Sequence, residues 1–260
     1  MTSDPPSLPG SGLDDEGSLA LHLPEWRTPA LGAIAGALVL AGAIADEAWL
    51  WTAVIALQLA IVATWHRSLD TPSAASGAVV GGGLAAIVDV VVAVTENEPS
   101  LGPIAVVLGA GYLVAVVQQL ARRDGRDHLV DALAATVSLG TIAALGAAWV
   151  VLWQLPDGED TVVVLAGAVV AAAVGRLAPG LAGALIGPLA AGIVAGALLG
   201  ASVDDVGLGL GLGLAAGIPA SLAAAMQAQV RGSGRGWVTG AVWPVLVAAP
   251  LGYIVLRVIG

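Results

Sequence analysis

Apolar runs of about twenty residues recur along the whole chain, and this feature limits most strongly how it can fold. An α-helix rises about 1.5 Å per residue, so one such run crosses a hydrocarbon layer about 30 Å thick. The runs are continuous stretches of Ala, Val, Leu and Gly, whereas β-barrel spans alternate in segments of about ten residues. Charged residues make up only 11% of the chain, against about a quarter in soluble domains. The sequence therefore predicts an all-α fold, a polytopic bundle of transmembrane helices.

About nine spans are predicted, and the charges between them test that number. The spans are placed at 29–45, 48–64, 74–94, 101–121, 129–152, 161–175, 179–200, 206–229 and 237–257. Eight of the nine arginines fall at every second boundary, namely Arg27, Arg67, Arg122, Arg123, Arg126, Arg176, Arg231 and Arg235. The boundaries between them carry Asp and Glu and no arginine. Because arginine is retained on the cytoplasmic side of short loops, the amino terminus is predicted to be cytoplasmic and the carboxyl terminus external.

Two regions are predicted, an acidic tail over residues 1–27 and a transmembrane domain over residues 28–260. The tail combines several acids with Pro, Ser and Gly, and it has too little apolar surface to fold, which predicts a disordered cytoplasmic segment. The chain has no cysteine, which excludes disulfides and thiolate chemistry. It also has no lysine and much Ala, Gly and Val, a usage typical of a GC-rich genome.

Tryptophan and glycine positions support the predicted spans. Most tryptophans lie at predicted span ends, where their amphipathic rings favour the headgroup layer; these are Trp26, Trp49, Trp51, Trp65, Trp149, Trp153 and Trp237. Trp243 is the exception. Glycines spaced four apart, as at Gly192, Gly196 and Gly200 and at Gly209 and Gly213, predict close contact between helix backbones in lipid.

Asp89 is the one acid well inside an apolar span. A carboxylate within a membrane is costly unless it is protonated or paired, so Asp89 is a candidate for an ion pathway. The alternative is a protonated or water-facing acid near the outer end of its span.

The segment from Arg122 to Asp131 concentrates charge at the predicted cytoplasmic side. If a helix continued through it, Asp124, Asp127 and Asp131 would align with His128 and could hold a divalent cation. Alternatively, Gly125 indicates a turn, Asp127 caps the next helix, and the arginines only fix the topology.

Several segments between Asp131 and Gly187 resemble phosphatidate cytidylyltransferase, the CDP-diacylglycerol synthase of bacterial membranes. The likeness lies in the apolar pattern and turns of Val130 to Thr136, Trp153 to Gly158, Val174 to Leu177 and, near the end of the chain, Leu246 to Tyr253. In that family a similar span ends in Pro-Asp-Gly, the next ends in Gly-Arg-Leu, and a span led by proline follows. Together this likeness covers about half of the chain, and it implies a location in a bacterial plasma membrane.

The polar motifs of that family are replaced in this sequence. Its Asp-Thr-Gly would fall near Ala168, its lysine-rich motif between Pro179 and Leu185, and its acidic Gly-Asp-Leu motif near Gly217, where no acid or lysine occurs. The family reaction joins two polyanions, so it needs bound magnesium and cationic side chains to neutralise charge. The resemblance therefore implies a non-catalytic relative, a pseudoenzyme with no cofactor. Its expected partners are membrane lipids, in particular anionic ones contacted by Arg176, Arg231 and Arg235, with a second copy or another protein as further candidates and no nucleic acid.

Two alternatives stay open. One is an active CTP-dependent phosphatidate cytidylyltransferase of phospholipid synthesis, with an atypical Mg²⁺ site built from Asp124, Asp127, Asp131, Arg122, Arg123 and Arg126. The other is a small-solute or ion-coupled transporter that uses Asp89. Transporters usually show repeated halves and interrupted helices, and an odd number of spans without a visible repeat argues against this alternative.

Overall fold

The computed structural model describes residues 26–68, 74–96, 98–121, 128–229 and 236–259, and all regular structure in these ranges is helical. The helices are α1 (Arg27–Ala45), α2 (Glu47–Ser68), α3 (Ala74–Val94), α4 (Gly102–Leu120), α5 (Leu129–Leu145), α6 (Ala148–Trp153), α7 (Gly158–Gly175), α8 (Gly180–Ser202), α9 (Val206–Gln229) and α10 (Trp237–Ile259). Within these ranges nine helical segments are long and apolar enough to cross a membrane, and α5 and α6 share one of them. The predicted fold class and number of spans are confirmed, and the chain is a polytopic integral membrane protein.

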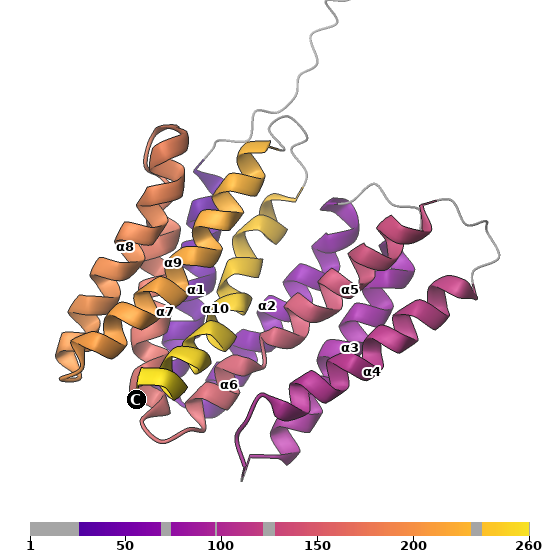
Figure 1. Ribbon diagram of the computed structural model, residues 1–260, viewed down its shortest axis with the longest axis horizontal. Helices are drawn as coiled ribbons and strands as arrows, with labels where there is room; N and C mark the ends of the chain where they lie inside the picture. Colours follow the sequence, from indigo (N-terminus) through magenta and orange to yellow (C-terminus); the bar gives the residue numbers. More distant parts are fainter. Residues whose placement is uncertain (1–25, 69–73, 97, 122–127, 230–235, 260) are drawn as a thin grey trace, which may run out of the picture.

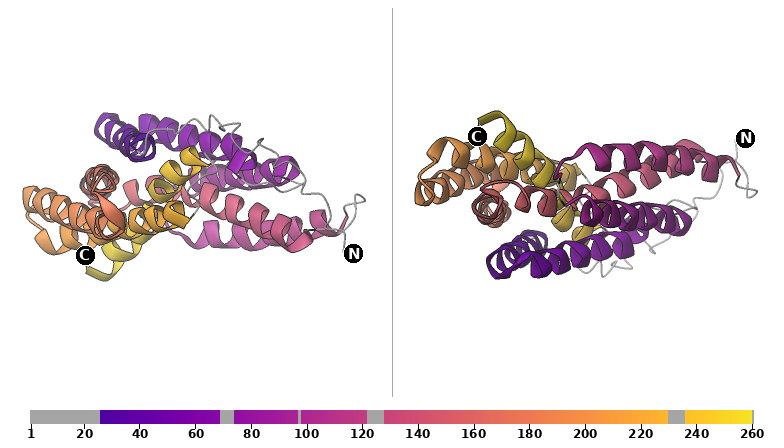
Figure 2. Two further views of the ribbon diagram at one scale, coloured as in Figure 1. Left: turned by 90° about the horizontal axis from the view of Figure 1, so that it is seen from above. Right: turned by 90° about the horizontal axis from the view of Figure 1, so that it is seen from below.

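The helices form two groups that meet along α2 and α5. In Figure 1, α3, α4 and α5 lie together on the right, while α7, α8 and α9 lie on the left with α1 and α10 beside them. The views along the perpendicular direction show the same separation, with α8 and α9 farthest from α3 and α4 (Figure 2). α6 packs with α7 and α10, so the span formed by α5 and α6 belongs to both groups.

The span over Leu129–Trp153 is interrupted between α5 and α6. The amides of Gly146 and Ala147 bond to carbonyls three residues earlier, Ala143 and Ala144, each at 3.1 Å. A Cβ on Gly146 would lie 2.9 Å from a methyl of Leu246 on α10. The tighter turn is therefore a local 3₁₀ segment at a position where α10 packs directly on the backbone. The sequence predicted this span, which is confirmed, but gave no sign of the interruption.

α8 and α9 pack through their glycines, as the four-residue spacing predicts. Cβ atoms on Gly192 and Gly209 would each lie 2.7 Å from backbone atoms of the opposite helix, so no larger residue fits without a shift. The alternating stretch Gly207 to Leu214 is helical, since it lies inside α9. The sixth predicted span is longer than expected, because α7 already begins at Gly158.

Trp149 packs inside the protein, whereas a tryptophan near a span end was expected to present its ring to the headgroup layer. Its side chain is fully buried, and its indole Nε1 donates to the backbone carbonyl of Val245 on α10 at 3.0 Å. The buried indole fills the junction between α6 and α10, and its polar atom finds a partner inside the protein. By contrast, Trp26 and Trp49 are exposed near helix ends, as predicted.

Candidate functional site

Three helices meet at the guanidinium of Arg176, directly after the last residue of α7. Only 8% of this residue is exposed. Its Nη1 donates to the carbonyl oxygen of Gly240 on α10 at 3.1 Å. Its Nη2 donates to Oε1 of Gln227 on α9. Arg176 therefore ties α7 to α9 and α10 at one end of the bundle.

The carbonyl that Arg176 uses is left without a helical donor by a proline. In a regular helix the amide of residue 244 would bond to the carbonyl of Gly240, but Pro244 has no N–H. Gly240 also lets the side-chain amide of Gln227 approach α10 closely, because a Cβ at Gly240 would overlap Nε2 of Gln227. The Pro and Gly spacing in α10 thus creates the acceptor for Arg176.

The charge of Arg176 has no acidic partner in the part of the chain that the structure describes. Its two bonded acceptors, a backbone carbonyl and an amide oxygen, are neutral. Burial lowers the pKa of Arg176 to about 10, so the guanidinium is cationic at neutral pH. A guanidinium has five N–H donors, so further donors remain for an anion.

The two ends of the bundle differ in charge among the described residues. Arg27 and Arg176 lie at the end where α1, α3, α5, α8 and α10 begin (Figure 1). The one described carboxylate at that end is Asp131 on α5, which pairs with His128. The other described acids, apart from Asp89 inside α3, lie at the opposite end; they are Asp46, Glu47, Glu96, Glu98, Asp157, Glu159, Asp160, Asp204 and Asp205. The described charges therefore separate between the two ends as the sequence predicts, and the assignment of the arginine end to the cytoplasm stays a prediction.

The predicted cytoplasmic metal site is described only in part. Asp131 lies in the first turn of α5, where its Oδ2 is 3.3 Å from Nδ1 of His128, and both side chains are exposed. Asp124 and Asp127 lie outside the described residues, as do Arg122, Arg123, Arg126, Arg231 and Arg235. Within the described ranges, no three His, Asp or Glu residues lie close enough to hold a metal ion.

Asp89 is half-buried, and among the described residues its one hydrogen-bond partner is Gln58 on α2. Nε2 of Gln58 donates to Oδ1 of Asp89 at 2.9 Å and also to the carbonyl oxygen of Ala143 on α5 at 3.0 Å. Gln58 itself is only 4% exposed. The acid that the sequence singled out therefore belongs to a polar contact among α2, α3 and α5.

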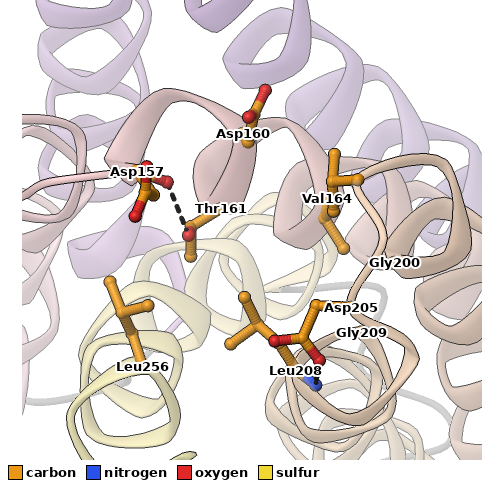
Figure 3. Close-up of a pocket in the computed structure, with 10 residues that line it drawn as sticks. Asp157, Asp160, Thr161, Val164, Gly200, Asp205, Leu208, Gly209 and Leu256 are labelled. Atoms are coloured by element: carbon orange, nitrogen blue, oxygen red, sulfur yellow. Dashed lines mark hydrogen bonds between the residues drawn. The ribbon is translucent and has the colours of Figure 1, made fainter. Parts of the chain in front are cut away.

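The opposite, acidic end of the bundle holds a cavity of about 220 Å³ between α7, α8, α9 and α10. Figure 3 shows Asp157, Asp160 and Asp205 around it. Oδ1 of Asp205 accepts from the amide of Leu208 at 2.8 Å, and the hydroxyl of Thr161 donates to the carbonyl of Asp157 at 2.9 Å. Asp205 is thus the N-cap of α9, and acids at the start of α7 lie where a helix favours negative charge.

Sequence reasoning missed the roles of Gln58 and of Gly240 with Pro244. Gln58 is an amide in the middle of an apolar run, a signal that could have paired it with Asp89. A proline four residues after a glycine marks a free carbonyl, but the sequence does not say which helix supplies its donor. The bond between Gln227 and Arg176 could not be found from the sequence either, because the two residues lie on different helices.

Comparisons with protein-family models, with curated proteins and with solved structures give no match.

Proposed function

We propose that this protein is a non-catalytic membrane protein that binds the phosphate of an anionic lipid at the arginine end of α7, α9 and α10. The observation that carries the proposal is the buried guanidinium of Arg176, which has only neutral partners among the described residues. The site belongs to the cytoplasmic leaflet of a bacterial plasma membrane in the orientation predicted from arginine.

The physical support is the imbalance of charge around Arg176. A buried cation is stable when a counter-charge or several oriented dipoles compensate it. The carbonyl of Gly240 and the amide of Gln227 supply dipoles but no negative charge. Lipid phosphates lie at the depth of helix ends, and the cytoplasmic leaflet is rich in anionic headgroups. A phosphate oxygen is the ligand that the remaining guanidinium donors recognise best.

Neighbouring features of the arginine end fit a lipid headgroup. Arg27 begins α1, and a Cβ on Gly32 of the same helix would lie 3.9 Å from Nη1 of Arg176. α1 therefore passes directly beside the guanidinium, with a second arginine more than one turn nearer the aqueous phase. Two cations on adjacent helices can flank one phosphate.

The proposal assumes the arrangement of spans and turns that resembles phosphatidate cytidylyltransferase, without the reaction of that family. In the resembling segments, the positions of the family's acids and lysines carry Ala, Val and Gly. Binding of a lipid phosphate needs only donors and positive charge, whereas transfer of a cytidylyl group also needs metal-bound CTP. Headgroup recognition is the part of that chemistry that Arg176 can perform alone.

Native mass spectrometry of the detergent-solubilised protein with short-chain phosphatidic acid tests the proposal. Phosphatidic acid should bind the wild-type protein more tightly than phosphatidylcholine of the same chain length. A hydrogen bond to a charged group contributes about 1.5–3 kcal/mol, so Arg176→Gln should weaken binding roughly ten- to hundredfold. Arg176→Lys keeps the charge, so its affinity for phosphatidic acid should lie between those of the wild type and of Arg176→Gln.

Arg257→Gln is the matched control, because Arg257 is exposed at the other end of the bundle and its guanidinium has a hydrogen bond and a cation–π contact with Tyr253 on its own helix. It should leave phosphatidic acid binding unchanged. Thermal unfolding of each variant separates lost binding from lost folding. A folded Arg176→Gln protein that binds phosphatidic acid as tightly as wild type would contradict the proposal.

A further inference from the structure

The contact among Gln58, Asp89 and Ala143 lies beside the interruption between α5 and α6. Both N–H groups of the Gln58 amide are in use, one at Asp89 and one at the Ala143 carbonyl. That carbonyl also accepts from the amide of Gly146 in the 3₁₀ turn. A Cβ on Gly146 would lie 3.3 Å from Cγ of Gln58, so the glutamine also packs against the turn.

The interruption joins the two helix groups of the protein. α5 packs with α3 and α4, and α6 packs with α7 and α10. α5 also contacts α2 and α10, so a change of backbone geometry between Leu145 and Ala148 would alter how the two groups pack on each other. Interrupted helices with polar groups inside the membrane are the usual sites where transporters bind coupling ions.

Asp89 lacks a compensating charge in the described part of the chain. Its one described donor is the amide of Gln58, and no described arginine or histidine forms an ion pair with it. The other ionisable side chains described on the helices that pack against α3 are engaged elsewhere: Glu47 with Gln154, Tyr112 with Thr141, and Asp131 with His128. An ionised carboxylate with a single donor inside a membrane is unfavourable, and binding of a proton removes its charge.

We propose that Asp89 is a proton-binding site and that Gln58 transmits its charge state to the turn between α5 and α6. In the ionised state the Gln58 amide donates to Asp89 and to Ala143. When a proton from water binds a carboxylate oxygen of Asp89, the new O–H donates to Oε1 of Gln58. The amide then turns, and the Ala143 carbonyl loses its side-chain donor. Hydronium delivers the proton, so one of its O–H bonds breaks as the carboxyl O–H forms, and a water molecule is released.

This inference does not depend on lipid binding at Arg176. Gln58 lies on α2 and Asp89 on α3, whereas Arg176 contacts α9 and α10. Loss of one site therefore leaves the other testable.

Infrared difference spectroscopy of the protein reconstituted in lipid tests proton binding. As the pH falls, the wild-type spectrum should gain, besides the C=O bands of the exposed acids, a further C=O band from one protonated carboxyl group, and this further band should be absent in Asp89→Asn. Asp160→Asn, a change at the acidic end of the bundle, should retain it. A wild-type spectrum with no such band, or a band that Na⁺ removes at constant pH, would overturn the proposal.

Distance measurements between spin labels test the transmission. The natural chain has no cysteine, so Val130→Cys on α5 and Leu177→Cys after α7 place labels uniquely in the two helix groups. Both positions are exposed, at 75% and 54%. The label distance should shift with the same pH midpoint as the carboxyl band, and Gln58→Met should abolish the shift while the band remains. A shift that persists unchanged in folded Gln58→Met, or no shift in the wild-type background, would overturn the role of Gln58.

Discussion

Arg176 supplies the hydrogen bond that Pro244 cannot make. Pro244 leaves the carbonyl of Gly240 without its helical donor, and Nη1 of Arg176 donates to that oxygen at 3.1 Å. The free carbonyl that Pro244 leaves in α10 and the guanidinium of Arg176 after α7 therefore stabilise each other. The contribution of this hydrogen bond to stability can be measured without any ligand.

A double-mutant cycle should show that the two residues are coupled. Arg176→Gln should destabilise the natural protein by about 1.5–3 kcal/mol, since it removes a bond from a charged donor. In a Pro244→Ala background the new amide bonds to Gly240, so the same change should cost less, with a coupling energy above about 0.5 kcal/mol. Unfolding by denaturant in detergent measures the free energy of unfolding of the wild type, the two single variants and the double variant. Strict additivity of the two changes would show that the carbonyl is not shared.

The glycines between α8 and α9 should tolerate no side chain. Gly209→Ala places a Cβ 2.7 Å from Cα of Gly200, and neither backbone can move without separating the helices. Overpacking of this kind costs about 1–3 kcal/mol. Gly109→Ala on α4 is the control, because a Cβ there meets nothing within 4 Å. Thermal unfolding should show a loss for Gly209→Ala and no loss for Gly109→Ala. Equal effects would mean that α8 and α9 are farther apart than described.

The nine spans followed from the sequence because span length and charge depend only on local composition. Runs of Ala, Val and Leu show which segments prefer lipid, and the charges of Arg27, Arg176 and Asp205 fall on alternate ends as the structure has them. Asp89 stood out for the same reason, since one acid in an apolar run is visible without knowledge of the fold.

Contacts between distant helices could not be read in the same way. Gln58 and Asp89 are 31 residues apart and Arg176 and Gly240 are 64 apart, so their pairing depends on how the helices pack. The interruption after Leu145 has no proline to mark it, and it arises where Leu246 and Gln58 crowd Gly146. The burial of Trp149 could not be predicted in the same way. A tryptophan near a span end usually favours the headgroup layer, and the carbonyl that accepts its indole N–H, that of Val245, is 96 residues away.

Trp149 should contribute more to stability than an exposed tryptophan. Trp149→Phe keeps most of the ring but leaves the buried carbonyl of Val245 without the indole donor, so a loss of about 0.5–1.5 kcal/mol is expected. Trp49→Phe, at a side chain that is largely exposed, should change the unfolding free energy by less than about 0.5 kcal/mol. The free energy of unfolding in denaturant measures both. A neutral Trp149→Phe would show that the indole bond adds nothing to packing.

The orientation of the bundle can be tested with single cysteines, because the natural chain contains none. Glu98 lies between α3 and α4 at the acidic end, and Leu177 follows α7 at the arginine end; both side chains are exposed. Arginine is retained in the cytoplasm, so Glu98→Cys in intact cells should react with a membrane-impermeant maleimide and Leu177→Cys should react only after the membrane is opened. The reverse pattern would place Arg176 in the outer leaflet, and the proposed lipid site would then not belong to the cytoplasmic leaflet. Reaction of both cysteines in intact cells would contradict the separation of the two ends by a bilayer, on which the roles of Arg176 and Asp89 both depend.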